Sequence, residues 1–177
     1  GASLEKFETV RAESPAALRA RFGLPVTGPL IGIVGRLQRW KGMHTLIAAM
    51  PVVRARHPDA QLVLAGSMAT DDPEGFHMWE LTEDARGGDR RIHLLSNIQQ
   101  VGSVQVNAFQ RAADVVLQKS LREGFGLTVS EALWKARPVV ASAVGGIPLQ
   151  IAHKYSGLLC RSVEGAAFAI KQVLNNL

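Results

Sequence analysis

Cysteine is almost absent from this 177-residue chain, and its scarcity excludes two common ways of stabilising a fold. The single cysteine, Cys160, has no partner within the chain for a disulfide. No cluster of cysteine and histidine has the spacing of a zinc site, so a structural metal is not expected either. A chain without disulfides is typical of a reducing compartment, and we expect this protein in the cytoplasm.

Long apolar runs are also missing from the sequence. The longest, at residues 30–35 and 139–144, are far shorter than the roughly 18 residues that a membrane-spanning helix needs. No basic segment followed by an apolar one marks an export signal, so we expect a soluble protein with no membrane partner. The chain starts at Gly1 without a methionine, and we expect it to be part of a longer protein.

Aromatic residues make up only 6% of the chain, and they are not interleaved with basic residues as in a nucleic-acid-binding surface. Lysine and arginine number 20 against 15 aspartates and glutamates, which gives a net charge of +5. A charge of this size is compatible with an anionic ligand, although it is also common on ordinary soluble domains. We therefore expect no nucleic-acid partner, and the charge alone identifies no other.

What the sequence does contain is a regular alternation of short apolar runs and amphipathic segments of helical length. The short runs are apolar throughout, which is typical of strands that are buried on both faces of a parallel sheet. The pattern predicts an α/β fold with a doubly wound, mostly parallel six-stranded sheet, whose ligands bind beyond the carboxyl ends of the strands. The predicted strands are residues 30–34, 61–65, 91–95, 114–118, 138–142 and 157–160.

Capping residues suggest how the chain is divided. Ser14 and Pro15 predict the start of a short helix that ends at Gly23. This helix belongs to a leading or hinge segment of residues 1–28, and residues 29–177 are expected to form the ligand-binding domain.

Three helices of that domain are marked by their own signals. Apolar residues at three- and four-residue spacing predict one helix over residues 43–56. The tripeptide Asp72-Pro73-Glu74 predicts the start of the next, with an N-cap, a proline at the first position and an acid in the first turn. A last helical pattern covers residues 163–177.

The turn after the first predicted strand carries two cations. Gly35 lets the backbone approach a ligand, while Arg36 and Lys41 flank the turn that leads to the next helix. Arginine binds phosphate oxygens bidentately, lysine acts as a point charge and a helix N-terminus offers free amides, so a diphosphate site is predicted. The alternative is a solvated basic turn. Neither GxGxxG nor a Walker loop is present to support a nicotinamide or P-loop site.

The segment 120–132, which follows the fourth predicted strand, is the most informative. Its glycines expose backbone amides in a strand-to-helix loop, Glu123 precedes the helix, and Glu131 is expected about two turns into it. Carboxylates accept hydrogen bonds from sugar hydroxyls, and this pair is spaced to hold two parts of one extended ligand. The alternative is that Glu123 only favours the helix electrostatically and that Glu131 is a surface residue.

A double glycine, Gly145-Gly146, ends the fifth predicted strand. Such a pair either forms a nest of amides for an anion or simply turns the chain. Taken alone, this pair favours the turn.

Together these segments resemble the C-terminal, donor-binding Rossmann-like half of the retaining glycosyltransferases of family four, which have the GT-B fold. The order and spacing match along residues 30–160. Within the family, residues 68–75, 106–118 and 122–135 look like the trehalose-forming glycosyltransferring synthases and the related retaining trehalose phosphorylases. The motifs that carry the resemblance are Val34-Gly35-Arg36 with Lys41-Gly42, Leu62-Val63-Leu64-Ala65-Gly66, Glu123-Gly124-Phe125-Gly126-Leu127 with Glu131-Ala132, Pro138-Val139-Val140-Ala141-Ser142, and Gly145-Gly146-Ile147-Pro148.

The resemblance implies a role for each matching residue. The family's first-motif cations neutralise the donor diphosphate, which gives Arg36 and Lys41 that role and the stabilisation of the leaving group. The family's first glutamate contacts the transferred hexose and the second holds the nucleotide ribose, which gives Glu123 and Glu131 these roles. Glu123, Arg36 and Lys41 are thus the expected catalytic residues. The further donor-binding residues that we expect are Gly35, Asn97, Ile98, Gly124, Phe125, Gly126, Leu127 and Thr128, of which Asn97 and Ile98 rest on loop position alone.

The reaction implied is transfer of glucose from a nucleoside diphosphate glucose, with UDP or ADP as nucleotide, to glucose. It forms trehalose with retention at the anomeric carbon, by front-face attack in which the leaving phosphate accepts the proton. Glu123 then orients the sugar without being a nucleophile, and no carboxylate pair suited to glycosidase chemistry is evident. No metal or cofactor is expected. The alternatives are a trehalose phosphorylase, another family-four hexosyltransferase with a different acceptor, and a non-catalytic nucleotide-sugar-binding module.

The partners implied are a nucleotide sugar, a sugar acceptor and the family's N-terminal Rossmann domain, which carries the acceptor site and is absent from this chain. A site between two domains needs both walls, so we expect the chain alone to bind nucleotide weakly and to be nearly inactive. A homodimer of the full-length protein is a further possibility.

Two departures from the family pattern lie away from the donor motifs. Ala136 stands where relatives often have glycine, and residues 153–157 replace a turn rich in aspartate and glycine. We expect these differences to affect fine specificity at most.

Overall fold

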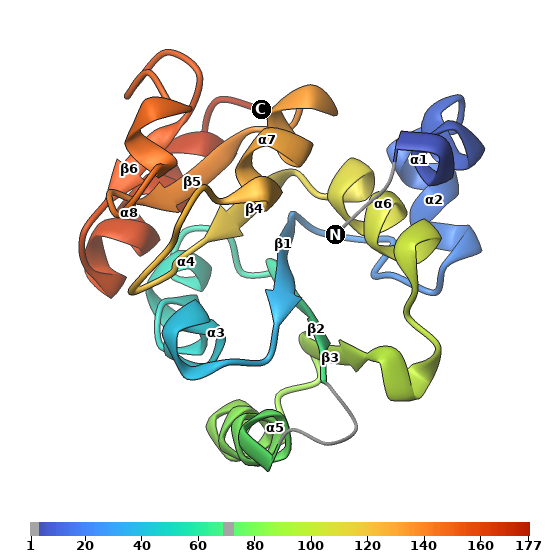
Figure 1. Ribbon diagram of the computed structural model, residues 1–177, viewed down its shortest axis with the longest axis horizontal. Coiled ribbons are helices and arrows are strands. Elements are labelled where there is room, and N and C mark those ends of the chain that lie inside the picture. Colours follow the sequence, from blue (N-terminus) through green and yellow to red (C-terminus); the bar gives the residue numbers. More distant parts are fainter. Residues whose placement is uncertain (1–3, 69–72) are drawn as a thin grey trace.

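The structure, a computed structural model, describes residues 4–68 and 73–177 and contains one six-stranded parallel sheet with helices on both faces (Figure 1). The predicted cap Asp72 and part of the 68–75 stretch lie outside the described residues. The doubly wound α/β prediction is confirmed, and each strand lies within two residues of its predicted range. The strands, in the sheet order β3-β2-β1-β4-β5-β6, are β1 (Leu30–Arg36), β2 (Gln61–Ser67), β3 (Ile92–Ser96), β4 (Val115–Gln118), β5 (Val139–Ser142) and β6 (Leu158–Cys160).

The connections between the strands are mostly helical. Short 3₁₀ turns η1 (Arg39–Lys41), η2 (Asn97–Gln99) and η3 (Ile147–Leu149) follow β1, β3 and β5. The helices are α1 (Leu4–Arg11), α2 (Pro15–Arg21), α3 (Met43–Ile47), α4 (Met50–Arg54), α5 (Pro73–Arg86), α6 (Ser103–Ala112), α7 (Leu127–Trp134) and α8 (Val163–Leu174).

Side chains of each strand alternate between two helical layers, because successive residues of a strand point to opposite faces. On β1, Ile31 and Ile33 join the core beneath α3, α4, α5 and α8, whereas Leu30 packs with Phe109 of α6 on the other face. Val116 of β4 faces that second side too, where α7 covers it. Each large aliphatic side chain buried in this way contributes about 1.5–3 kcal/mol to stability.

The single helix predicted over residues 43–56 is wrong, because the chain there forms two short helices, α3 and α4. Pro51 lies in the first turn of α4 and has no N–H to donate to the carbonyl of Ile47, four residues earlier. The series of helical hydrogen bonds is therefore interrupted between α3 and α4. The apolar spacing still holds, since Leu46, Met50 and Val53 are all buried in one core.

The leading segment is firmly packed on the sheet domain. The sequence pattern does not predict α1, yet its residues Phe7 and Val10 pack into the α6 core, and Figure 1 shows α1 and α2 beside α6. From α2, the nearly buried Arg19 forms an ion pair with Asp114 at 2.6 Å, and Asp114 also accepts a hydrogen bond from the Leu30 amide at 2.7 Å. The division of the chain at residue 28 stays a prediction.

Both departures from the family pattern fall on strained backbone. Ala136 and Lys154 adopt φ angles of 54° and 70°, in the left-handed region that favours glycine. After α7, the Ala136 amide donates to the Leu133 carbonyl at 3.0 Å and the Arg137 amide donates to Ala132 at 3.0 Å, which is a Schellman motif. The position of Ala136 in this motif is the one that glycine usually occupies.

Replacing Ala136 with glycine is therefore expected to stabilise the protein. Relief of the left-handed strain, about 1–2 kcal/mol, exceeds the added entropy of glycine in the unfolded chain, so the free energy of unfolding should rise by about 0.5–1 kcal/mol. Urea denaturation measures this difference. The control Ala17→Gly, in the exposed helical turn of α2, should lower stability by about 1 kcal/mol. Equal losses for both variants would contradict the assignment of strain.

Candidate functional site

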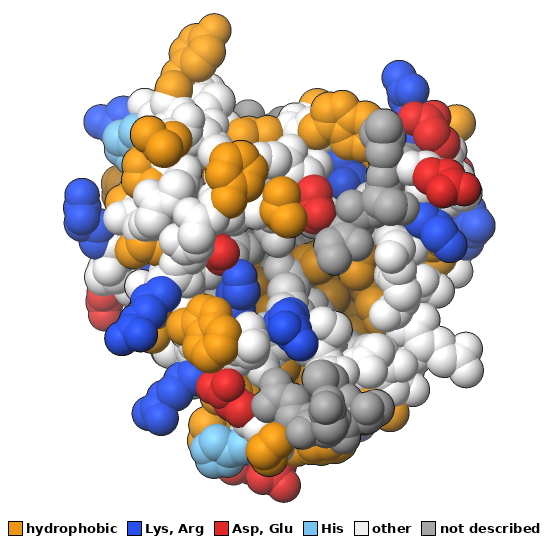
Figure 2. Space-filling view, in the orientation of Figure 1, with side chains coloured by type: hydrophobic (Ala, Val, Ile, Leu, Met, Phe, Trp, Pro, Cys, Tyr) orange, Lys and Arg blue, Asp and Glu red, His pale blue; other side chains and the backbone are white. Residues whose placement is uncertain are grey.

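A cavity of about 580 Å³ opens at the carboxyl ends of β1 and β4. The sheet order reverses between these two strands, since the chain moves from β1 out to β3 and then returns to β4 on the other side. Loops that leave such neighbouring strands diverge and create a crevice. Figure 2 shows this face hollowed in its middle, with acidic and basic side chains around the hollow.

Most of the predicted site residues meet at this cavity, but three do not. The Asn97 side chain instead accepts a hydrogen bond from the Met68 amide at 2.8 Å, and the side chain of Ile98 is exposed. The Gly124 carbonyl accepts a hydrogen bond from the Gly146 amide at 2.7 Å. The predicted residues that line the cavity are Gly35, Arg36, Lys41, Glu123, Phe125, Gly126, Leu127, Thr128 and Glu131.

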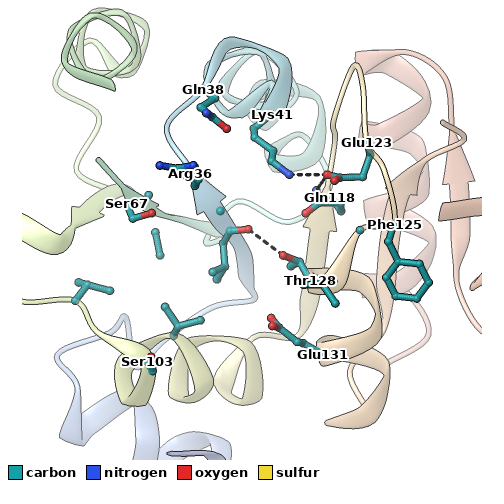
Figure 3. A pocket seen from close by; sticks show the side chains of 18 of the residues that line it. Arg36, Gln38, Lys41, Ser67, Ser103, Gln118, Glu123, Phe125, Thr128 and Glu131 are labelled. Atoms are coloured by element: carbon teal, nitrogen blue, oxygen red, sulfur yellow. Dashed lines mark hydrogen bonds and ion pairs between the residues drawn. The ribbon is translucent and has the colours of Figure 1, made fainter. Parts of the chain in front are cut away.

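An ion pair joins the two sides of the cavity. Lys41, after β1, reaches Glu123, after β4, with its Nζ 2.6 Å from Oε2 (Figure 3). Gln118 Nε2 at 2.8 Å and Ser120 Oγ at 3.1 Å donate to the same oxygen. The alternative in which Glu123 serves mainly to favour the helix is thus not the arrangement found. Among the described residues, the side-chain hydrogen bonds to Glu123 all end on Oε2, which leaves Oε1 available to a ligand.

Sequence reasoning missed Gln118 and Ser120. The available signal was the polar Gln118 at the end of an otherwise apolar buried strand, because a buried amide needs a hydrogen-bond partner. Gln38, Trp40 and Ser103 also line the cavity and were not predicted.

These contacts determine the charge of Glu123. Burial by itself raises the pKa of the carboxyl, but the hydrogen bond and positive charge of Lys41, together with the hydrogen bonds from Ser120 and Gln118, bring it below its ordinary value. Glu123 is therefore an anion at neutral pH. The exposed guanidinium of Arg36, in contrast, has no ion-pair partner among residues 4–68 and 73–177, and it also faces the cavity.

The start of α7 forms another wall of the cavity. Its N-cap residue is Gly126, which has no side chain to cap the helix, so the amides of Leu127 and Thr128 are available to an anion, whereas the Val129 amide donates to the Gly126 carbonyl at 2.9 Å. The Thr128 hydroxyl donates to the Val34 carbonyl at 3.4 Å and links α7 to β1. Glu131 was expected two turns into the helix but lies about one turn in, because α7 begins only at Leu127. Its Oε2 accepts a hydrogen bond from Gln110 at 2.8 Å.

The double glycine Gly145-Gly146 supports the Glu123 loop from behind. Gly145 has a φ of 55°, and a Cβ there would lie 1.6 Å from the Glu123 carbonyl oxygen. The Gly146 amide donates to Gly124 in the same loop. The turn alternative is thus the one found, and the close backbone approach explains why side chains are excluded at this position.

Other kinds of site are not seen in the part of the chain that the structure describes. There, no group of three histidine, cysteine, aspartate or glutamate side chains is arranged to hold a metal ion. No helix among these residues combines the length and apolar character needed to cross a membrane.

A family model described as "Glycosyl transferases group 1" matches residues 16–176. The chain belongs to this glycosyltransferase family. It is 50% identical over 157 residues to trehalose synthase of Rubrobacter xylanophilus, a match that covers 89% of this chain and 38% of the relative. The chain thus spans about two fifths of that relative's length. The predicted family resemblance is confirmed.

Solved glycosyltransferases share the fold. Sucrose-phosphate synthase of Thermosynechococcus elongatus superposes with a TM-score of 0.77 at 31% identity, over 91% of this chain and 40% of that one. HepE of Anabaena, solved in complex with UDP-glucose, gives a TM-score of 0.70 at 23% identity, over 98% of this chain and 43% of that one. The glycosyltransferase domain therefore has the fold of one half of a GT-B enzyme.

Lys41→Met should raise the pKa of Glu123, because the burial of the carboxyl remains after the compensating cation and its hydrogen bond are lost. The rise is measured by ¹³C NMR titration of the Glu123 carboxyl. In the wild type, the lowered pKa stabilises the fold above the ordinary pKa, and this stabilisation disappears as the pH falls through the folded-state pKa. The control Lys171→Met, on α8, should leave the Glu123 pKa unchanged. A low pKa that persists in Lys41→Met would contradict the ion pair.

Proposed function

We propose that this chain is the donor-binding half of a retaining glycosyltransferase that transfers glucose from a nucleoside diphosphate glucose to glucose and so forms trehalose. The observation that carries the proposal is the meeting of two cations, a helix N-terminus and two glutamates around one cavity. The 50% identity to trehalose synthase of Rubrobacter xylanophilus supports the choice of sugars.

The diphosphate of the donor lies between Arg36 and the start of α7 in this proposal. Arg36 offers a planar guanidinium that binds phosphate oxygens bidentately, and the first-turn amides of α7 add donors from the opposite wall. Lys41 is already paired with Glu123, so it approaches the phosphate as a cation fixed in place. A cation held before the substrate arrives costs no reorganisation when negative charge develops on the leaving nucleotide.

The two glutamates hold the two sugars of the donor. Glu123 is ionised, and its Oε1 is the oxygen that accepts a hydrogen bond from a hydroxyl of the transferred glucose. Glu131, about one turn into α7, accepts hydrogen bonds from the ribose hydroxyls. The nucleotide is UDP or ADP.

In the reaction, the bond between the anomeric carbon of glucose and the diphosphate oxygen breaks, and the electron pair leaves with the nucleotide. A hydroxyl oxygen of the acceptor glucose bonds to the same carbon from the same face, and its proton passes to the departing phosphate. Arg36 and Lys41 stabilise that phosphate, while Glu123 orients the sugar. This order of events retains the configuration without a covalent enzyme intermediate.

The acceptor glucose needs a second wall, which we assign to a further domain, since the chain spans 38% of the length of the trehalose synthase relative. The chain alone is then a weak nucleotide binder with little turnover. A trehalose phosphorylase or another hexosyltransferase of the family retains the same donor site, and only the products separate these alternatives. A non-catalytic module has no chemical need for Arg36, Lys41, Glu123 and Glu131 together.

In the complete polypeptide that carries these residues, UDP-glucose or ADP-glucose with glucose should yield trehalose, detected by ¹³C NMR. Glu123→Gln and Arg36→Ala should each lower kcat/KM by about 10²–10³-fold, because each removes stabilisation of the transition state. The control Glu80→Gln, on an exposed face of α5, should leave the rate unchanged.

Three results would argue against the proposal. Appreciable trehalose synthesis by the 177-residue chain alone would show that no second wall is needed. Glucose 1-phosphate formed only from trehalose and phosphate would identify a phosphorylase. Transfer to a different acceptor sugar, with none to glucose, would exclude trehalose as the product.

A further inference from the structure

A buried chain of hydrogen bonds leads away from the cavity behind Glu131. Gln110 of α6 donates from Nε2 to Glu131 Oε2 at 2.8 Å, and Lys135 donates from Nζ to Gln110 Oε1 at 2.7 Å. Gln110 is 1% exposed and Lys135 is 4% exposed, whereas Glu131 lines the cavity. These hydrogen bonds therefore connect a residue at the ligand site to a buried cation.

This arrangement fixes the orientation of the Gln110 amide. An ammonium group only donates hydrogen bonds, so Lys135 requires the amide oxygen and leaves the amide nitrogen for Glu131. A flipped amide would place its nitrogen against the ammonium and its oxygen against the carboxylate, with two repulsive contacts in place of two hydrogen bonds. Lys135 thus makes Gln110 a donor toward Glu131.

Lys135 is held in place by aromatic rings. Its Nζ lies 5.1 Å from the centre of the Phe7 ring and 5.8 Å from that of Trp134, and these two rings meet edge to face at 4.6 Å. Aromatic faces attract a cation by their negative electrostatic potential. Phe7 belongs to α1, so the leading segment closes the far end of the chain of hydrogen bonds.

The burial of Lys135 has a cost that packing alone does not explain. Burial lowers the pKa of Lys135 to about 8, although the nearby Glu131 favours the charged form. The cations Arg11 and Arg111 line one pocket together with Lys135 and add no attraction for it. An apolar side chain in this position would avoid the desolvation of an ammonium group. The hydrogen bonds of the Lys135 ammonium go to the Gln110 amide oxygen and, at 3.4 Å, to the backbone carbonyl of Glu131.

We propose that Gln110 and Lys135 are positioning residues that hold the Glu131 carboxylate in the orientation that receives the ribose hydroxyls of the donor nucleotide. The inference rests on the proposed function, because it takes the ribose as the group that Glu131 binds. By this inference Gln110 of α6 and Lys135 at the end of α7 contribute to nucleotide affinity, although neither side chain lines the cavity. Lys135 and Gln110 thus act on the ligand only through Glu131.

The test compares each nucleotide with its 2′,3′-dideoxy form, which lacks the hydroxyls that Glu131 would bind. Isothermal titration calorimetry of the 177-residue chain with UDP, ADP and the two dideoxy forms gives a ribose preference for each variant. Gln110→Leu and Lys135→Met should each reduce affinity for the tighter-binding ribonucleotide about tenfold, the value of one hydrogen bond to a charged group. Affinity for the dideoxy form should change less than about twofold.

Two further variants separate positioning from general damage to the fold. Lys135→Arg keeps a cationic donor near Gln110 Oε1 and should recover most of the ribonucleotide affinity. Gln61→Met removes a hydrogen bond to His93 at the start of β2, remote from the cavity, and should leave the ribose preference unchanged. If Gln110→Leu fails to fold, Lys135→Met provides the same comparison.

The possible failures are distinguishable. Equal losses of affinity for the ribonucleotide and the dideoxy form leave the ribose preference unchanged. This result would show that Gln110 and Lys135 serve stability alone, and it would overturn the positioning role while the proposed function stands. A wild-type chain that binds both forms equally would refute the ribose role of Glu131 itself, and the inference with it.

Discussion

The ion pair between Lys41 and Glu123 is the contact on which the cavity depends. It joins the loops after β1 and β4, which the topology of the sheet sends apart, and the Leu121 amide strengthens the link by donating to the Trp40 carbonyl at 2.6 Å. A partly buried pair repays its desolvation only when further hydrogen bonds satisfy it, as those from Gln118 and Ser120 do here. The pair thus fixes the distance between the two walls.

The two glutamates of the cavity are each held by a separate polar network. Glu123 is fixed from β4 and from the loop after β1, whereas Glu131 is fixed from α6 and from the end of α7. Carboxylates that are oriented before the ligand arrives lose little entropy on binding. The fold therefore does more than create a crevice between β1 and β4. Side chains from α6 and the end of α7 also orient Glu131, which lines the cavity.

The sequence predicted the strands well, because parallel strands buried on both faces are apolar without interruption. Local chemistry explains the errors: Pro51 splits a helix that apolar spacing alone predicted as continuous, and α1 has only Leu4, Phe7 and Val10 as a short apolar signal. Asn97 was placed by loop position without a motif, and its side chain lies at the Met68 amide and not in the cavity. The contact of Gln110 with Glu131 could not be predicted from the sequence, since only tertiary packing shows which polar side chains of a helix face a buried partner.

The central claim is that this cavity binds the diphosphate and ribose of a nucleotide. The most direct test is calorimetric titration of the chain with UDP, ADP and GDP, repeated on Arg36→Ala and Glu131→Ala, with the exposed Arg56→Ala as control. We predict that one nucleotide binds best, that both site variants weaken it by about tenfold or more, and that the control does not. Affinities unchanged in both site variants would contradict the account.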